Sequence, residues 1–264
     1  MAARGFELSL LELDLVGEAL NLDVRQFPFQ FPFHGELIED RQRLAEVAER
    51  TLTGKGLVVE RRFSPDLEEL VGVYARGWLS LAMLGTAGER QLYARVASDG
   101  RSAVLVQQRE QVLTFTPVNP EGLVRPLVSL IPPMKPGPGR SVTVSQSPAA
   151  GPPRHLRPDE DQEYSGGVLQ AVRPQQDSQG LSQGYVEEVM QKRRLGGCGF
   201  TVTARNRNGR PGKPLTMSTI DTESGRYALI PAERPDGGID VSFTPADLPR
   251  IDQALTRYVQ MLSS

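Results

Sequence analysis

Residues 219–245 read TIDTESGRYALIPAERPDGGIDVSFTP, a pattern of strand, tight turn, strand, loop, strand and helix start. The same plan occurs earlier in the chain, where Asp99-Gly100-Arg101 opens it and Phe115-Thr116-Pro117 closes it. In the later copy, Ser224-Gly225-Arg226 and Phe243-Thr244-Pro245 take these places. An Asp-Gly pair between apolar runs is a strong hairpin signal. The echo therefore predicts two related halves built on a β-sheet.

The first half follows the order helix, four strands, helix. Ser64 caps the first helix and Pro65 occupies its first turn. Residues 78–116 hold four apolar runs separated by turn residues, which predicts four strands. Asn119-Pro120 then begins a second helix.

The second half repeats this order. A helix is predicted over residues 184–195 and ends at Gly196-Gly197. Thr244 caps the last helix, with Pro245 at its first position. The strands between the two helices cover residues 199–205, 215–221, 226–231 and 239–244. The sequence therefore predicts an α+β fold, with a central antiparallel β-sheet, flanking helices and two halves related by a quasi-twofold axis.

The N-terminus begins with a strand at residues 5–10 and a helix capped by Ser9, with Glu12 completing a capping box. The predicted buried face of this helix consists of Leu11, Leu15, Ala19 and Leu22. The phenylalanines of FPFQFPF, residues 27–33, alternate and so share one face of an extended chain. We predict that they pack on the core, and an aromatic groove for a partner is the alternative.

The whole chain, residues 1–264, is predicted to form one domain. Its halves are residues 5–133 and 184–264. A short strand is predicted at residues 141–144. Pro, Gly, Ser and Gln dominate residues 146–183, which predicts a flexible loop that contains His155.

Composition excludes several functional classes. The net charge of -2 gives no strong field that would recruit nucleic acid or acidic lipid. No stretch approaches the ~20 apolar residues that span a bilayer, and the N-terminus makes a poor signal peptide. The single Cys198 has no disulfide partner, which favours a reducing cytosol. We therefore predict a cytoplasmic protein with no membrane insertion.

The search for catalytic or metal-binding motifs is negative. No HExxH, CxxC or nucleophile-elbow motif occurs, and His34 has no ligand-spaced partner. Cys198 is interpreted as a small residue in a tight site, and Asp221 with Glu223 as turn chemistry rather than an acid–base pair. The basic runs at 192–194 and 205–213 are interpreted as solvated surface, with RNA binding as the alternative. We predict no enzyme, no cofactor and no metal.

Several segments together resemble one known family. They are GGCGFTVTARNRNGR at 196–210, DTESGRY at 221–227, the Phe-Thr-Pro-Ala-Asp entry at 243–247 and the final amphipathic helix. The opening strand, the helix with Leu11-Glu12-Leu13-Asp14 and the Pro/Phe-rich segment fit the same pattern. The chain therefore resembles the EspG family over nearly its whole length apart from residues 146–183.

The resemblance implies a cytosolic chaperone of the type VII (ESX) secretion system of actinobacteria. It implies a PE–PPE heterodimer, or a related secreted helical protein, as the partner that is kept soluble and delivered for export. A protein-binding adaptor unrelated to secretion is the alternative. The expected oligomeric state is a monomer or weak dimer. The motif at 221–227 is expected to be structural, through Asp221, Thr222, Gly225, Arg226 and Tyr227.

Candidate partner-binding residues lie on the 184–195 helix, in the strand after it and in the first-half hairpin. They are Tyr185, Val189, Met190, Arg193, Phe200 and Arg101. An apolar patch with a polar rim would suit the exposed apolar tip of a client. The alternative is that Tyr185 and Val189 belong to the ordinary core.

Overall fold

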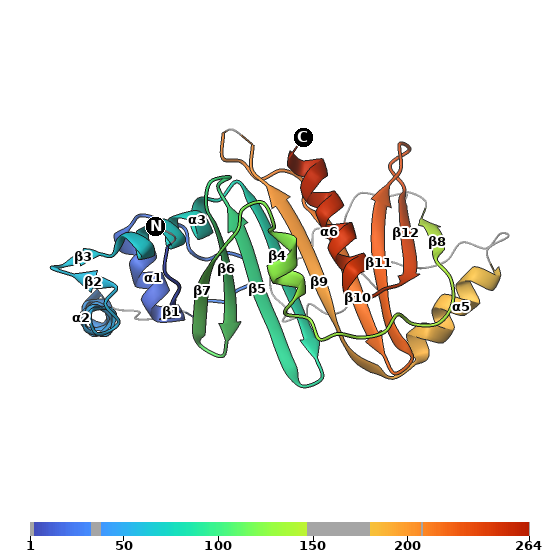
Figure 1. Ribbon diagram of the computed structural model, residues 1–264, viewed down its shortest axis with the longest axis horizontal. Helices are drawn as coiled ribbons and strands as arrows, with labels where there is room; N and C mark the ends of the chain where they lie inside the picture. The colour runs from blue at the N-terminus through green and yellow to red at the C-terminus, as the bar shows by residue number, and fades with distance from the viewer. Residues whose placement is uncertain (1–2, 33–37, 147–179, 207, 264) are drawn as a thin grey trace. The chain divides into compact units, whose positions relative to one another are not determined.

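Helices separate groups of antiparallel strands along the chain, and Figure 1 labels these elements. This computed structural model describes residues 3–32, 38–146, 180–206 and 208–263. The helices are α1 (Leu10–Ala19), α2 (Ile38–Gly54), α3 (Pro65–Arg76), α4 (Val124–Val128), α5 (Gly180–Gln191) and α6 (Leu248–Ser263). Most of the predicted flexible loop, and with it His155, lies outside the described residues, as does His34.

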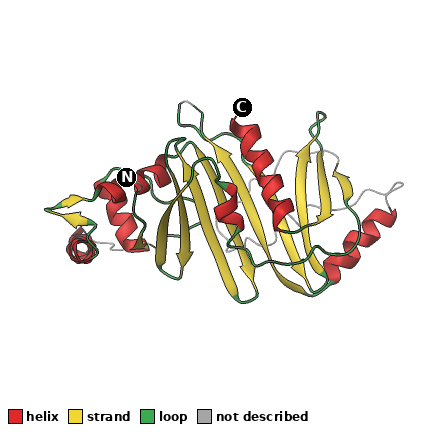
Figure 2. Cartoon of the chain, viewed as in Figure 1, coloured by secondary structure: helices red, strands yellow, loops and turns green. Residues whose placement is uncertain are grey.

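The strands carry most of the regular structure, as the cartoon in Figure 2 shows. The first group is β1 (Phe6–Ser9), β2 (Val58–Val59), β3 (Arg62–Phe63), β4 (Leu79–Ala87), β5 (Arg90–Ser98), β6 (Ala103–Arg109) and β7 (Val112–Val118). The second group is β8 (Val142–Gln146), β9 (Arg194–Ala204), β10 (Leu215–Thr222), β11 (Gly225–Glu233) and β12 (Ile239–Pro245). The predicted α+β class with a large antiparallel sheet is confirmed, and the order helix, four strands, helix occurs at α3, β4–β7, α4 and again at α5, β9–β12, α6.

The chain forms two compact units, and each is built from separated stretches of sequence. Unit 1 contains Met1–Pro132, Phe200–Leu215 and Leu248–Ser264. Unit 2 contains Pro133–Gly199 and Thr216–Asp247. The predicted halves, residues 5–133 and 184–264, follow the linear sequence and stay a prediction.

In unit 1 the strands follow the order β1-β7-β6-β5-β4, with β9 beside β4. Helix α3 packs on β5 and β6, and its buried residues include Leu67, Leu70, Val71 and Tyr74. The Tyr74 ring meets Phe115 edge-on at 5.6 Å between ring centroids, and Phe115 stacks on Phe6 at 5.0 Å. These contacts join α3, β7 and β1 into one apolar core.

Local capping residues set the helix starts that the sequence predicts best. The Glu12 N–H donates to Ser9 Oγ at 3.1 Å, and the Ser9 N–H donates to Glu12 Oε2 at 2.6 Å. Likewise the Leu67 N–H donates to Ser64 Oγ at 3.3 Å. Each cap needs only residues three apart in the chain, so neighbouring residues suffice to predict it.

The predicted buried face of α1 is wrong. Leu10, Leu13 and Val16 are buried, whereas Leu11 and Leu15 are only partly buried and Ala19 is exposed. The difference arises because the acidic residues Glu12 and Asp14 are also buried in α1. The ion pairs of these two carboxylates, described below, allow the polar side of the helix that carries them to be buried.

The predicted packing of the phenylalanines on the core is confirmed for Phe29 and Phe31 but is wrong for Phe27, and Phe33 lies outside the described residues. Phe29 is buried and lies 6.2 Å from Tyr74 between ring centroids, and Phe31 is partly buried. Phe27 is 44% exposed. The buried Arg95 guanidinium donates to the Phe27 carbonyl at 3.0 Å, so this segment is held by its backbone as well as by its rings.

In unit 2 the strand order is β9-β10-β11-β12-β8. The predicted strand at 141–144 is confirmed as β8, which pairs antiparallel with β12 through Val144 and Val241. A second apolar core forms from Val189, Ile220, Tyr227, Leu229 and Phe243. Tyr227 stacks on Phe243 at 4.9 Å between ring centroids.

Three predicted helix limits are wrong. Helix α5 ends at Gln191, and Gly196-Gly197 lie inside β9 instead of ending the helix. Glycine is needed at 197 because a Cβ atom there would collide with the Thr219 carbonyl on β10. Helix α4 begins at Val124 rather than near Asn119. Helix α6 begins at Leu248, since Thr244 and Pro245 pair with β11 as the last residues of β12.

Candidate functional site

The motif at 221–227 forms the tight turn between β10 and β11. Thr222 pairs with Gly225, and Thr222 Oγ1 donates to the Gly225 carbonyl at 2.9 Å. Gly225 has a φ of 132°, which glycine adopts without strain. The predicted turn chemistry therefore lies with Thr222, while Asp221 has another role.

Asp221 and Arg226 form a buried ion pair across this hairpin. Arg226 Nε donates to Asp221 Oδ1 at 2.6 Å, and Nη2 donates to Oδ2 at 2.7 Å. The Arg226 side chain is 0% exposed and that of Asp221 is 7% exposed. Such a two-point pair fixes the geometry of the hairpin, which supports a structural role for the motif.

A Pro/Gly-rich strap, residues 133–140, lies against the backbone of Arg226. The Arg226 N–H donates to the Lys135 carbonyl at 3.0 Å, and the Gly137 N–H donates to the Arg226 carbonyl at 2.9 Å. A Cβ atom at Gly137 would collide with the Tyr227 ring, so glycine is required there. Nothing in the sequence patterns predicted this contact, although the alternation Pro-Gly-Pro-Gly at 136–139 is its visible signature.

Helix α5 is attached to the strap through two tyrosines. Tyr185 Oη donates to the Pro138 carbonyl at 2.6 Å, and Tyr227 Oη donates to the same oxygen at 3.1 Å. Burial and the neighbouring Tyr185 hydroxyl raise the pKa of Tyr227 to about 12, so it remains a donor at neutral pH. Val189 lies on the buried face of α5, at 1% exposure, and packs in the unit 2 core.

The six candidate partner-binding residues differ in how far their side chains are buried. Val189 and Phe200 are buried, so neither side chain contacts a partner in this conformation. Tyr185 and Met190 are partly buried on α5, and Arg193 and Arg101 are exposed. Arg193 follows the end of α5 instead of belonging to the helix. Two residues further on, Leu195 is 38% exposed.

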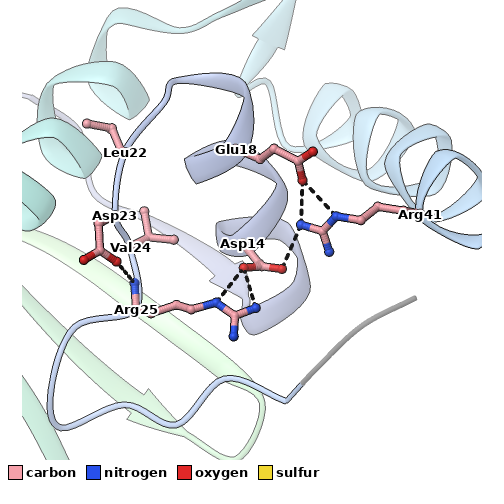
Figure 3. Close-up of a pocket in the computed structure, with 7 residues that line it drawn as sticks. All are labelled: Asp14, Glu18, Leu22, Asp23, Val24, Arg25 and Arg41. Carbon is pink, nitrogen blue, oxygen red and sulfur yellow. Dashed lines mark hydrogen bonds and ion pairs between the residues drawn. The ribbon is translucent and has the colours of Figure 1, made fainter. Parts of the chain in front are cut away.

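A separate pocket of about 330 Å³ lies in unit 1, lined by α1, the segment after it and α2 (Figure 3). Asp14 Oδ1 accepts from Arg25 Nη2 at 3.1 Å, and Asp14 Oδ2 accepts from Arg41 Nη2 at 3.0 Å. Arg41 also contacts Glu18 at 2.6 Å. Each of these charged groups has an opposite charge beside it. The ion pairs of Arg41 with Asp14 and Glu18 therefore link α2 to α1. Sequence reasoning missed this network because its members are far apart in the chain.

Glu12 makes a second link between α1 and α2. Lys55 Nζ donates to its Oε2 at 2.7 Å, and Thr51 Oγ1 donates to its Oε1 at 2.7 Å. Burial alone would raise the pKa of Glu12, but the hydrogen bonds from Lys55, Ser9 and Thr51 outweigh it and lower the pKa below its ordinary value of 4.5. The stabilisation by ionised Glu12 is therefore fully present above pH 4.5 and is lost as the pH falls through the lower folded-state pKa.

We expect Glu12→Gln to lower the free energy of unfolding by about 1 to 3 kcal/mol at neutral pH, because charged hydrogen bonds are replaced by weaker ones. The difference from the wild type should shrink in acid, as the wild-type carboxylate takes up its proton. Urea unfolding from neutral to acid pH measures this, with exposed Glu46→Gln on α2 as the control. A difference that stays constant across the range would contradict the assignment.

The described residues show no group of three or more His, Cys, Asp and Glu side chains that could hold a metal ion. Burial raises the pKa of the Cys198 thiol to about 12, so this side chain is protonated at neutral pH. That state agrees with the interpretation of Cys198 as a small buried residue. No helix in the described parts of the chain is long and apolar enough to cross a membrane.

Comparison with known proteins identifies the family. A model of the EspG family matches residues 9–257, and the chain therefore belongs to the EspG family. Its fold is similar to that of the Mycobacterium tuberculosis type VII secretion system chaperone EspG5, solved in complex with the PE25-PPE41 dimer. The TM-score is 0.63 at 13% identity, and the match covers 98% of this chain and 97% of that chain. No curated protein sequence matches the chain.

Proposed function

We propose that this protein is a type VII secretion chaperone that binds a PE–PPE heterodimer or a similar helical pair, keeps it soluble and delivers it for export. The observation that carries the proposal is the family match over residues 9–257. The similarity to EspG5 over 98% of this chain supports it, because that structure contains a PE–PPE dimer. The proposal includes a cytoplasmic location and no catalytic step.

The contact surface that we propose in unit 2 combines Met190, Arg193 and Leu195 with the partly buried Tyr185. Met190 and Leu195 supply apolar area at the end of α5 and the start of β9, and exposed Arg193 lies between them in the chain. An apolar centre beside a cation matches the composition of protein interfaces, where Met and Arg are enriched. Arg101 is proposed as a contact on unit 1.

Co-expression of the chain with a candidate PE–PPE pair tests the function. We expect a soluble, stoichiometric complex by size-exclusion chromatography with light scattering, whereas the pair alone should aggregate. If the chain instead elutes alone beside a soluble or precipitated pair, the client assignment fails. Stoichiometric recovery of a different protein from a lysate, with no PE–PPE pair bound, would favour the alternative of an adaptor unrelated to secretion.

The double variant Arg193→Glu and Leu195→Asp tests the contact surface. We expect the dissociation constant for the client to rise at least about tenfold, since charge reversal and loss of an apolar contact act at one surface. Arg62→Glu on β3 is the matched control, because Arg62 is likewise exposed. Titration calorimetry measures the affinity. An unchanged affinity in the double variant would show that the client binds at another surface.

A further inference from the structure

Positive charge collects in one part of the sequence, although the chain as a whole carries a net charge of -2. Between Val189 and Ile220 there is no acidic residue, while lysines and arginines recur. Three of them, Arg205, Arg210 and Lys213, lie in the described part of the β9–β10 loop in unit 1 (Figure 1). Arg205 is partly exposed, and the other two are exposed.

The described residues of this loop, 205–206 and 208–214, are held by hydrogen bonds of their own. Asn206 Oδ1 accepts from the N–H groups of Asn208 and Arg210, both at 3.0 Å. The Gly212 N–H donates to the Ala204 carbonyl at 2.8 Å, and Arg205 pairs with Pro211 in an isolated β-bridge. The backbone under these cations is therefore already arranged, which reduces the ordering cost of binding.

A second turn brings another cation to the same end of the unit 1 sheet. The Arg205 N–H donates to the Trp78 carbonyl at 2.6 Å. A Cβ atom at Gly100 would lie 3.4 Å from Trp78 Nε1, so the Asp99–Ser102 turn lies beside the same tryptophan. The basic rim is defined here as Trp78, Arg101, Arg205, Arg210 and Lys213.

Carboxylates near the basic rim do not neutralise its three arginines. Asp99 Oδ1 accepts from the N–H groups of Arg101 and Ser102, both at 2.8 Å, and Glu69 Oε1 accepts from Ser102 Oγ at 2.7 Å. Among the described residues, the structure shows no ion pair for Arg101, Arg205 or Arg210. The guanidiniums therefore keep their capacity for an external carboxylate.

Arg95 adds to the positive field of unit 1. It is buried and donates to the Phe27 carbonyl and to Gln26 Oε1, which are both uncharged acceptors. Burial first, and then repulsion by Arg205, lower the pKa of Arg95 to about 10, so it remains charged at neutral pH.

We propose that the basic rim is a docking site for an acidic segment of a partner protein. It shares Arg101 with the proposed client contacts but is distinct from the client surface on α5. Guanidinium groups bind carboxylates at two points, and Trp78 offers a ring beside them. A long nucleic acid fits less well, because Trp78 is the chain's only tryptophan, the rim consists of two short turns, and the protein as a whole is acidic. This inference does not depend on the proposed client.

Because Trp78 is the single tryptophan, its fluorescence reports on the basic rim. A synthetic hexaglutamate peptide titrated into the full chain at low salt should change the emission, with an affinity that falls as salt is added. The triple variant Arg101→Glu, Arg205→Glu and Arg210→Glu should bind at least about tenfold more weakly. Hexaglutamine is the uncharged control peptide.

The matched control variant is Arg90→Glu with Arg109→Glu, because these exposed arginines lie at the opposite ends of β5 and β6. It should bind hexaglutamate as the wild type does. Circular dichroism verifies that the triple variant is folded, and Arg210→Gln alone should still weaken binding. Equal affinity in the triple variant, no binding by the wild type, or tighter binding of oligodeoxythymidylate than of hexaglutamate would each overturn the proposal.

Discussion

Replacing Arg226 by alanine should lower the free energy of unfolding by about 3 to 5 kcal/mol, because it leaves the Asp221 carboxylate buried without its counter-charge. Arg226 is 0% exposed, and its two-point contact with Asp221 is the most buried ion pair that the structure describes. The loss should appear as faster amide hydrogen exchange in β10 and β11. Urea unfolding followed by circular dichroism measures its size.

Arg101→Ala is the matched control for this prediction. Arg101 occupies the corresponding place in the first-half turn, but its side chain is exposed. Its removal should change the free energy of unfolding by no more than about 0.5 kcal/mol. The double variant Asp221→Leu with Arg226→Met should be more stable than Arg226→Ala, since two apolar side chains leave no buried charge. If Arg226→Ala were as stable as the wild type, the pair would have no structural role.

Val189→Asp should destabilise unit 2 by about 4 kcal/mol or more, because it places a carboxylate in an apolar cluster. Val189 is 1% exposed and packs with Ile220, Tyr227, Leu229 and Phe243. We expect a lower melting temperature and faster proteolytic cleavage near α5. Gln191→Asp is the control, since Gln191 is exposed on the same helix.

This second prediction also decides between core and interface for the buried side of α5. If Val189→Asp abolished client binding while the melting temperature stayed at the wild-type value, the side chain would have to reach the client directly. That result would require α5 to leave its place beside Tyr227. Loss of stability in the free protein instead assigns Val189 to the core.

Features that depend on neighbouring residues could be predicted from the sequence. The Ser9 capping box and the Ser64 cap need only residues three positions apart, and the Asp99 and Ser224 turns need only four. Apolar runs between such signals then identify the strands β4–β7 and β9–β12. Together these features were enough to predict the α+β class.

Features that depend on distant residues could not be predicted. Glu12 and Asp14 are buried because Lys55, Arg25 and Arg41 meet them, and no local pattern shows this pairing. The burial of two candidate site residues could not be predicted for the same reason. Val189 is an apolar residue on a mostly polar helix, and Phe200 follows a Gly-rich run, and either position fits a binding surface and a core equally well. Only their burial in the structure separates the two.

The discontinuity of the two units has a consequence for biosynthesis. Unit 1 begins at the N-terminus but needs Phe200–Leu215 and α6, whereas unit 2 is complete once Asp247 has been made. A nascent chain leaves the ribosome from its N-terminus, so the partners of the first 132 residues emerge well after those residues. Ile251 and Leu255 are buried in α6, so the apolar surface that they cover stays exposed on the growing polypeptide until α6 has been made. A chaperone of this design would thus itself depend on protection during its synthesis.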